Sequence, residues 1–156
     1  MSEPKKLAII ATKGTLDWAY PPFILASTAA ALSYEVHIFF TFYGLQLLRK
    51  DLDLKVTSLG NPAMPMPMPV PVFMQALPGM EGMMTSMMKK QMKSKGVASV
   101  EELRDLCLEA DVKMTACQMT VDLFDFKKED LIEDIDFGGA ATFFEFAGES
   151  DICLYI

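Results

Sequence analysis

Runs of apolar residues recur along the chain and are separated by stretches with helical spacing. Continuous apolar runs are typical of strands in a parallel sheet whose two faces are both covered, whereas strands with one wet face alternate apolar and polar residues. The run "KLAIIA" is the clearest example. We expect strands at 6–11, 35–41, 54–59, 112–116 and 151–156, of which the third has the weakest pattern.

Helical patterns fill the intervals between these strands. Pro21 and Pro22 suit the first turn of a helix, because proline lacks the N–H that this turn does not use, and we expect this helix to continue to about Ser33. Further helices are expected at 42–50, at 80–95, directly after Cys117, at 129–134 and at 138–148.

One helix start has a specific signature. Ser99 is followed three residues later by Glu102, which is the pattern of a capping box. The expected inward face of this helix is formed by Leu103, Leu106, Cys107 and Ala110.

The alternation of strands and helices predicts the fold class. It is typical of an α/β protein with a mostly parallel central sheet, here of about five strands, and with helices on both faces. A length of 156 residues corresponds to one domain, so we expect residues 1–156 to form a single unit.

A proline- and methionine-rich arm at about 60–96 interrupts this pattern. Six prolines lie between Pro62 and Pro78 and predict an extended loop, since proline fixes φ and removes a backbone donor. The helix that follows has methionines at helical spacing, at 80, 83, 84, 87, 88 and 92, flanked by lysines at 89, 90, 93 and 95. Gly96 is expected to end it.

Composition and charge exclude several classes of protein. The formal net charge of −7 argues against nucleic-acid binding, which needs clustered lysine and arginine. No apolar stretch has the length of a spanning helix or of a secretory signal. The three cysteines are an odd number without a disulfide pattern, so we expect a reducing, cytoplasmic location.

Cys117 is the main candidate for chemistry, because it lies where a predicted strand runs into a predicted helix. Ligand sites of open parallel sheets lie outside the carboxyl ends of the strands. The free N–H groups of a helix start favour an anion and lower the pKa of a cysteine, so no histidine is needed to activate it. Geometry alone leaves open whether Cys117 is a reactive thiolate or a small buried apolar residue.

The other two cysteines are expected in the core. Cys107 lies on the apolar stripe of its helix, and Cys153 lies within a strand among apolar neighbours. Neither forms a CxxC pair with Cys117, and the spacing does not indicate zinc, so we expect no metal site.

Weaker signals have simpler explanations. Methionines 64, 66 and 68 alternate with prolines and invite a Cu(I) site, but flexible methionine also suits adaptable interfaces. The loop "ATKGT" lacks the nucleotide-binding patterns, so no cofactor is expected. Membrane contact by the basic Met helix is disfavoured by the acidic net charge. His37 is expected in the core or an interface, Gly138 and Gly139 in helix–sheet packing, and the acidic run 122–136 on a solvated face.

Three segments resemble the soluble DsrE-like sulfur-relay proteins: "FFTFYGLQLL", "LPGMEGMMTSMMKKQMKSKGVASVEEL" and "ACQMTVDLFDFKKEDLIEDIDFGGAATFF". The similarity extends from about Leu7 to Ile156. Asp125 is a departure, because the family often has glycine at this position. Aspartate tolerates the left-handed conformation better than most residues, so we expect a local cost and an intact fold.

The resemblance implies a three-layer α/β/α fold, a homo-oligomer such as a trimer or a multiple of it, and a cysteine that carries sulfur as a persulfide or a related adduct. It maps that cysteine to Cys117. The partners that it implies are rhodanese-like sulfurtransferases and small TusA-type carriers.

Our interpretation is therefore a sulfur carrier, similar to a sulfurtransferase, that accepts sulfane sulfur on Cys117 and relays it to partner proteins. One alternative is a thiol peroxidase or redox sensor that forms a sulfenic acid at Cys117. Another is a ligand-binding or interaction module with an inert Cys117. We expect the arm at 60–96 to join an oligomer contact or to act as a mobile cover of Cys117.

Overall fold

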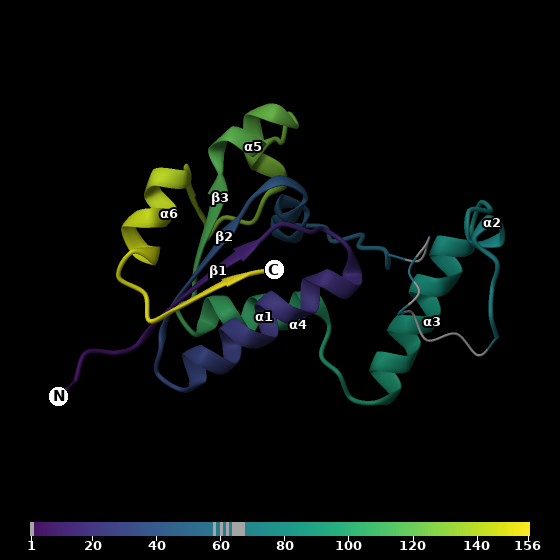
Figure 1. Ribbon diagram of the computed structural model, residues 1–156, viewed down its shortest axis with the longest axis horizontal. Helices are drawn as coiled ribbons and strands as arrows, with labels where there is room; N and C mark the ends of the chain where they lie inside the picture. Colours follow the sequence, from purple (N-terminus) through teal and green to yellow (C-terminus); the bar gives the residue numbers. More distant parts are fainter. Residues whose placement is uncertain (1, 58, 60, 62, 64–67) are drawn as a thin grey trace.

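Five parallel strands form the middle layer of the structure, a computed structural model that describes residues 2–57, 59, 61, 63 and 68–156. Their order is β4-β3-β2-β1-β5. Helices lie on both sides of the sheet, so the predicted α/β/α architecture is confirmed (Figure 1). The strands are β1 (Lys6–Ala11), β2 (Glu35–Phe40), β3 (Lys113–Cys117), β4 (Asp136–Gly138) and β5 (Ile152–Tyr155).

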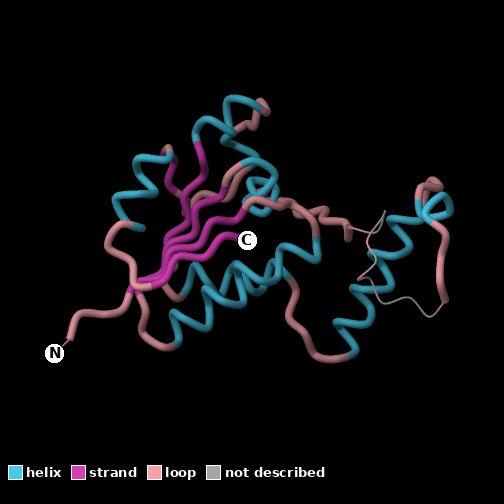
Figure 2. Tube along the Cα trace, viewed as in Figure 1, coloured by secondary structure: helices cyan, strands magenta, loops and turns pink. Residues whose placement is uncertain are grey.

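The two faces of the sheet are covered unequally (Figure 2). Helices α1 (Leu16–Ala31) and α4 (Val100–Glu109) pack on one face, where the rings of Phe23 and Phe40 lie 6.0 Å apart. Among the helices of the described residues, α6 (Ala140–Ala147) covers the other face, through rings such as Phe143, 5.4 Å from Phe39. The apolar runs of the central strands β1 and β2 are therefore buried from both sides.

Helix α1 begins five residues earlier than the prolines predict, at Leu16. The predicted start was wrong because Leu16, Ala19 and Phe23 form one buried helical face. Burial of this face offsets the backbone bonds that Pro21 and Pro22 cannot make inside the helix. Within the described residues, no helix combines the length and apolar character that crossing a bilayer requires.

Three predicted elements differ in the structure. Residues 54–57 form no strand; Leu54 and Val56 are buried, but Val56 N–H donates to the Thr85 hydroxyl of α3 and not to a neighbouring strand. In place of that strand the sheet contains β4, which was not predicted because three residues are too few to show a strand pattern. The predicted helices at 42–50 and 129–134 are the 3-10 helices η1 (Phe42–Leu48) and η2 (Lys128–Asp130).

Helix α4 has the predicted capping box, with Glu102 N–H donating to the Ser99 hydroxyl and Ser99 N–H donating to the Glu102 carboxylate. Its inward face is rotated from the prediction. Leu106 is 49% exposed and Ala110 is also exposed, whereas Val100, Arg104 and Cys107 are buried. The apolar pattern was misleading because Arg104 turns inward to donate to the carbonyls of Leu47 and Arg49 at the end of η1.

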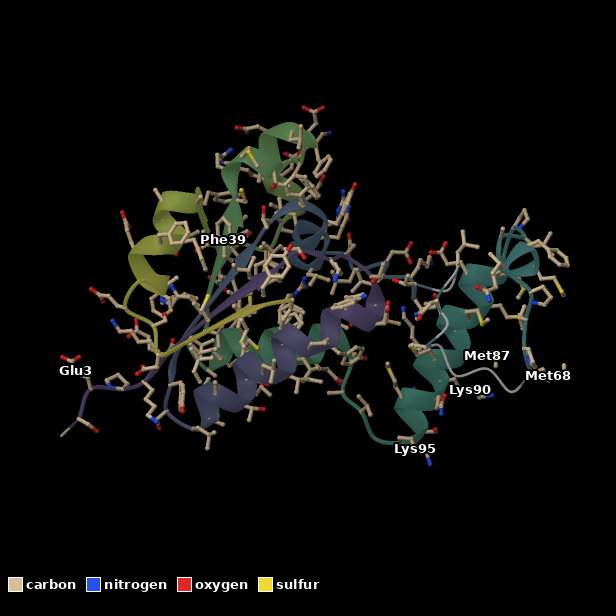
Figure 3. The ribbon with its side chains drawn as sticks, in the orientation of Figure 1. Glu3, Phe39, Met68, Met87, Lys90 and Lys95 are labelled. Carbon is tan, nitrogen blue, oxygen red and sulfur yellow. The ribbon has the colours of Figure 1, made fainter. Side chains whose placement is uncertain are left out.

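The arm leads to helices that project from the sheet. Helix α3 (Met80–Ser94) is preceded by a short helix, α2 (Val72–Gln75), within the segment that we expected to be extended. Met84 and Thr85 anchor α3 to the rest of the chain, whereas Met83 and Met87 are half exposed. Figure 3 shows Met68, Met87 and Lys90 at this end of the molecule. Pro62, Met64 and Met66 lie outside the described residues.

Four helices end in the same way, with a left-handed residue that lets two backbone N–H groups turn back onto free carbonyls. At α5 (Gln118–Leu123), Phe126 N–H donates to Val121 O at 2.9 Å and Asp125 has a φ of 53°. The expected left-handed conformation of Asp125 is thus confirmed. The equivalent residues after the other three helices are Ser33, Gly96 and Asp111, with φ values of 66°, 72° and 61°.

Candidate functional site

Cys117 is the last residue of β3 and the residue before the first turn of α5. It lies at the carboxyl end of a parallel strand, the edge at which ligand sites of open sheets form. This placement, which the sequence predicted, sets the thiol beside the first backbone N–H groups of α5. The register pairs Ala116 with Phe40, so Thr41, the next residue after β2, lies beside Cys117.

The polar groups around the sulfur favour the thiolate. Burial alone would raise the pKa of Cys117, but hydrogen bonding outweighs it and the pKa is lowered. The groups responsible are the backbone N–H groups of Thr120 and Met119 and the hydroxyls of Thr120 and Thr41. A lowered pKa makes Cys117 nucleophilic without an adjacent histidine or lysine.

Thr120 connects the helix to the neighbouring strand. It is fully buried, and its hydroxyl oxygen accepts the backbone N–H of Phe42 at 3.0 Å. The same oxygen lies 3.3 Å from the hydroxyl oxygen of Thr41. Neither threonine was predicted from the sequence. Thr41 could have been predicted, because a residue that follows β2 lies next to the end of β3 if the two strands pair.

Phe42 has an unusual backbone conformation, with a φ of 49°. The left-handed region is costly for a bulky residue, so the surrounding structure must impose it. The hydrogen bond to Thr120 holds one side of this residue. On the other side Gly44 approaches β1 so closely that a Cβ there would overlap the Ala11 carbonyl, and Gly44 N–H donates to Thr41 O at 3.0 Å.

Apolar side chains surround Cys117 at the surface. The thiol residue itself is only 5% exposed. The rings of Tyr43 and Phe124 are stacked at 5.6 Å, and Phe42 meets Phe124 edge-on at 6.0 Å. Met119, two residues after the thiol, is 58% exposed. The two elements next to Cys117, η1 and α5, therefore present apolar and aromatic side chains at the surface.

The other cysteines differ from each other. Cys107 is fully buried in the core, as predicted, and burial raises the pKa of its thiol to about 11 while its sulfur donates to Phe23 O. Cys153, predicted in the core, is exposed. That prediction was wrong because β5 is an edge strand, paired only with β1, and the short α6 leaves it open.

Of the remaining candidates, Gly138 pairs in register with Cys117, whereas His37 lies towards the other end of the sheet. His37 is half buried, stacked on Phe146 at 3.5 Å, and burial lowers its pKa. It pairs in register with Lys113, four residues before Cys117. Gly138 permits close helix–sheet packing as predicted, because a Cβ there would lie 2.8 Å from the Thr142 hydroxyl. A Cβ added at Gly139 would meet no such atom within 4 Å.

The described helices of the arm lie away from the thiol of the same chain (Figure 1). These helices, α2 and α3, lie at the end of the molecule opposite α6, well separated from α5 (Figure 1). The expected cover of Cys117 by this segment is therefore not formed by α2 or α3 of the same chain. The buried contacts of Met84 and Thr85 also fix the middle of α3 to the domain.

Comparisons with known proteins agree with this architecture. Residues 3–155 match the model of the DsrE/DsrF/DrsH-like family. The chain is 73% identical over 158 residues to the sulfur carrier protein DsrE2 of Allochromatium vinosum, covering 99% of each chain. It is 34% identical to the uncharacterized protein YrkE of Bacillus subtilis, covering 99% of this chain and 98% of the relative. The ychN protein of E. coli has a similar fold at 10% identity, with a TM-score of 0.56 over 97% of this chain and 99% of that chain.

Proposed function

This chain belongs to the DsrE/DsrF/DrsH-like family, and we propose that it is a sulfur carrier that holds sulfane sulfur on Cys117. The observation that carries the proposal is the environment of that thiol, in which two backbone N–H groups and two hydroxyls lower its pKa at the end of β3. The Allochromatium relative, named as a sulfur carrier, supports the same role.

The proposed loading step is an exchange without net oxidation. The Cys117 thiolate attacks the outer sulfur of a donor persulfide, a new S–S bond forms at Cys117, and the donor's S–S bond breaks. The electron pair leaves with the donor sulfur as a thiolate. The new persulfide is also an anion near neutral pH. The N–H and hydroxyl groups that stabilise the thiolate by hydrogen bonding therefore stabilise the persulfide as well.

The partners and the assembly are parts of the same proposal. Rhodanese-like enzymes and TusA-type carriers are the proposed donors and acceptors, and a homo-oligomer, a trimer or a multiple of it, is the proposed assembly. We place the protein in the cytoplasm because its three thiols suit a reducing compartment. Residues 1–156 are proposed to form one domain, whose arm at 60–96 contributes apolar side chains such as Met83 and Met87 to the contact.

Mass spectrometry after treatment with polysulfide tests the assignment of the site. We expect the mass of one or more sulfur atoms to be added to the peptide that contains Cys117, and the addition to be lost in Cys117→Ser. Cys153→Ser is the matched control, since it removes an exposed thiol and should leave the loading of Cys117 intact. Loading that survives in Cys117→Ser would refute the assignment. Peroxide consumption that depends on Cys117, without sulfur loading, would favour the thiol peroxidase instead.

A further inference from the structure

Exposed apolar side chains on η1 and at α5, the elements beside Cys117, form a surface that we call the aromatic ledge. We propose that the aromatic ledge is the docking surface for a partner protein whose reactive cysteine is flanked by apolar residues and surrounded by basic ones. This inference rests on the proposed function, because it names the kind of partner that exchanges sulfur with Cys117. The ledge consists of Phe42, Tyr43, Met119, Leu123 and Phe124.

The side chains of the ledge are all exposed to solvent. Tyr43 is 63%, Met119 58% and Leu123 57% exposed, and Phe42 and Phe124 are 43% and 40% exposed. Contiguous apolar patches on a protein surface mark interaction sites, and aromatic residues and methionine are enriched in interfaces. The packing of Phe124 against Tyr43 and Phe42 also holds the rings in place before a partner arrives, which lowers the entropy lost on binding.

The ledge and the thiol are built by the same contacts. Phe42 and Tyr43 come from η1, whereas Met119 and Phe124 come from α5 or its end. The hydrogen bond from Phe42 N–H to the Thr120 hydroxyl joins these two elements, and that hydroxyl also helps to lower the pKa of Cys117. A partner that covers the ledge is therefore positioned over the group with which it reacts.

The ledge has an acidic margin on its α5 side, whereas Lys13 lies beside Tyr43 on the η1 side. Residues 118–136 contain seven carboxylates and two lysines, a net charge of −5 in a chain whose total is −7. All nine side chains are exposed, and Asp122 and Asp125 directly flank the ledge residues Leu123 and Phe124. A potential of this sign steers basic partners to the surface and repels acidic ones.

The sign of this charge also disfavours a second copy in a symmetric pair. A two-fold contact places each patch against itself, so that the carboxylates of one acidic margin would face those of the other. A free small thiol gains little from this surface, because it is too small to contact several of the exposed ledge side chains at once. A protein segment with apolar residues on both sides of its cysteine can contact the ledge while its sulfur reaches Cys117.

The transfer step is balanced in atoms and electrons. The partner's thiolate attacks the outer sulfur of the Cys117 persulfide, a new S–S bond forms on the partner, and the bond between Cys117 Sγ and the outer sulfur breaks. The electron pair returns to Cys117 as its thiolate. No external oxidant or reductant is consumed.

Two synthetic peptides test the proposal as acceptors. Both contain one cysteine between two apolar residues, and they differ only in their flanking residues, which are lysines in one peptide and glutamates in the other. We expect transfer from the loaded protein to the lysine peptide to be at least tenfold faster at low salt, and the difference to shrink as salt screens the charges. Reduced glutathione serves as a third acceptor that makes few ledge contacts.

Variants separate the apolar and the charged contributions. Phe124→Ala should lower the ratio of the lysine-peptide rate to the glutathione rate at least threefold, whereas Phe144→Ala, which removes a ring that is 68% exposed on α6, should leave it unchanged. The double variant Asp122→Asn and Asp125→Asn should lower the preference for lysine over glutamate. Asparagine at 125 keeps the left-handed conformation accessible.

Equal rates with the two peptides at low salt, or equal effects of Phe124→Ala and Phe144→Ala, would overturn the docking surface. Failure of the proposed function is a separate result, in which polysulfide does not load Cys117 at all. The ledge is then tested by fluorescence anisotropy of the labelled peptides with the unloaded protein. Tighter binding of the lysine peptide that Phe124→Ala weakens supports the surface, and equal binding of both peptides refutes it.

Discussion

Replacement of Thr120 by valine should raise the pKa of Cys117 and slow its reactions. Valine has nearly the shape of threonine, so the fully buried site keeps its packing and loses only the hydroxyl. That hydroxyl is one of the groups that favour the thiolate, and it also accepts the N–H of Phe42. The substitution therefore removes one hydrogen-bond donor to the sulfur. The backbone N–H groups of residues 119 and 120 remain in place.

The size of the effect follows from the energy of one hydrogen bond to a charged group. Such a bond contributes about 1.5–3 kcal/mol, so its loss should raise the pKa of Cys117 and lower the thiolate fraction at a given acidic pH by roughly ten- to a hundredfold. A thiol of higher pKa is also a better nucleophile once ionised, with a Brønsted coefficient of about 0.4–0.5. Below both pKa values, alkylation should therefore slow by roughly three- to tenfold.

The assay is the rate of alkylation by iodoacetamide as a function of pH, in a Cys153→Ser background that removes the exposed thiol. Cys107 does not interfere, since burial raises its pKa to about 11. Thr85→Val is the matched control. The Thr85 hydroxyl is also buried and accepts the N–H of Val56 at 3.1 Å, but it lies in α3, away from the thiol.

We expect both valine variants to lose stability by about 1–3 kcal/mol, because each leaves a backbone N–H without its acceptor. Only Thr120→Val should shift the pH profile of Cys117. An unchanged profile in Thr120→Val would show that the hydroxyl does not contribute, and that the backbone N–H groups alone set the pKa. An equal shift in Thr85→Val would show that lower stability, and not a lost donor, causes the change.

Three further predictions concern stability, measured by urea denaturation. The pKa of Cys117 is lowered in the folded state, so its ionisation stabilises the native state fully above the unfolded pKa of about 8.5. The difference in free energy of unfolding between the native sequence and Cys117→Ser should therefore shrink as pH falls through the folded pKa. A difference that stays constant with pH would contradict the lowered pKa. Asp125→Gly should stabilise by about 0.5–1 kcal/mol, because glycine adopts the left-handed conformation without cost; a loss of stability would contradict this. Gly44→Ala should destabilise by roughly 1–3 kcal/mol, since its Cβ would overlap a carbonyl, whereas Gly82→Ala, in the first turn of α3 with open space around the added Cβ, should stabilise by up to about 1 kcal/mol; equal effects would refute the close approach.

The sequence predicted the parts of the fold that depend on local pattern. The apolar runs of β1 and β2 are long enough to be recognised, and Cys117 was placed correctly because a strand and a helix meet at it. The three-residue β4 has no recognisable period. The segment at 54–57 has the composition of a strand, but Val56 uses its N–H to bind Thr85, a choice that depends on a distant helix.

Errors at individual residues have the same origin in non-local contacts. Cys153 has apolar neighbours in sequence, yet its exposure depends on β5 lying at the sheet edge, which is decided by strand order. Arg104 is buried because it donates hydrogen bonds to the carbonyls at the end of η1, a contact between residues far apart in the sequence. Thr120 has no sequence motif, and its role at the thiol emerges only when η1 and α5 are brought together.

The left-handed conformation of Phe42 places a strained backbone next to the site. A non-glycine residue in this region lies about 1–2 kcal/mol above its relaxed state, which reduces the preference for the observed backbone by roughly a factor of ten. The bond to Thr120 opposes this relaxation. A ligand that contacts Phe42 and favours this backbone therefore also favours the hydrogen bond that positions the Thr120 hydroxyl beside the sulfur of Cys117. Occupancy of the surface and acidity of the thiol are then thermodynamically linked.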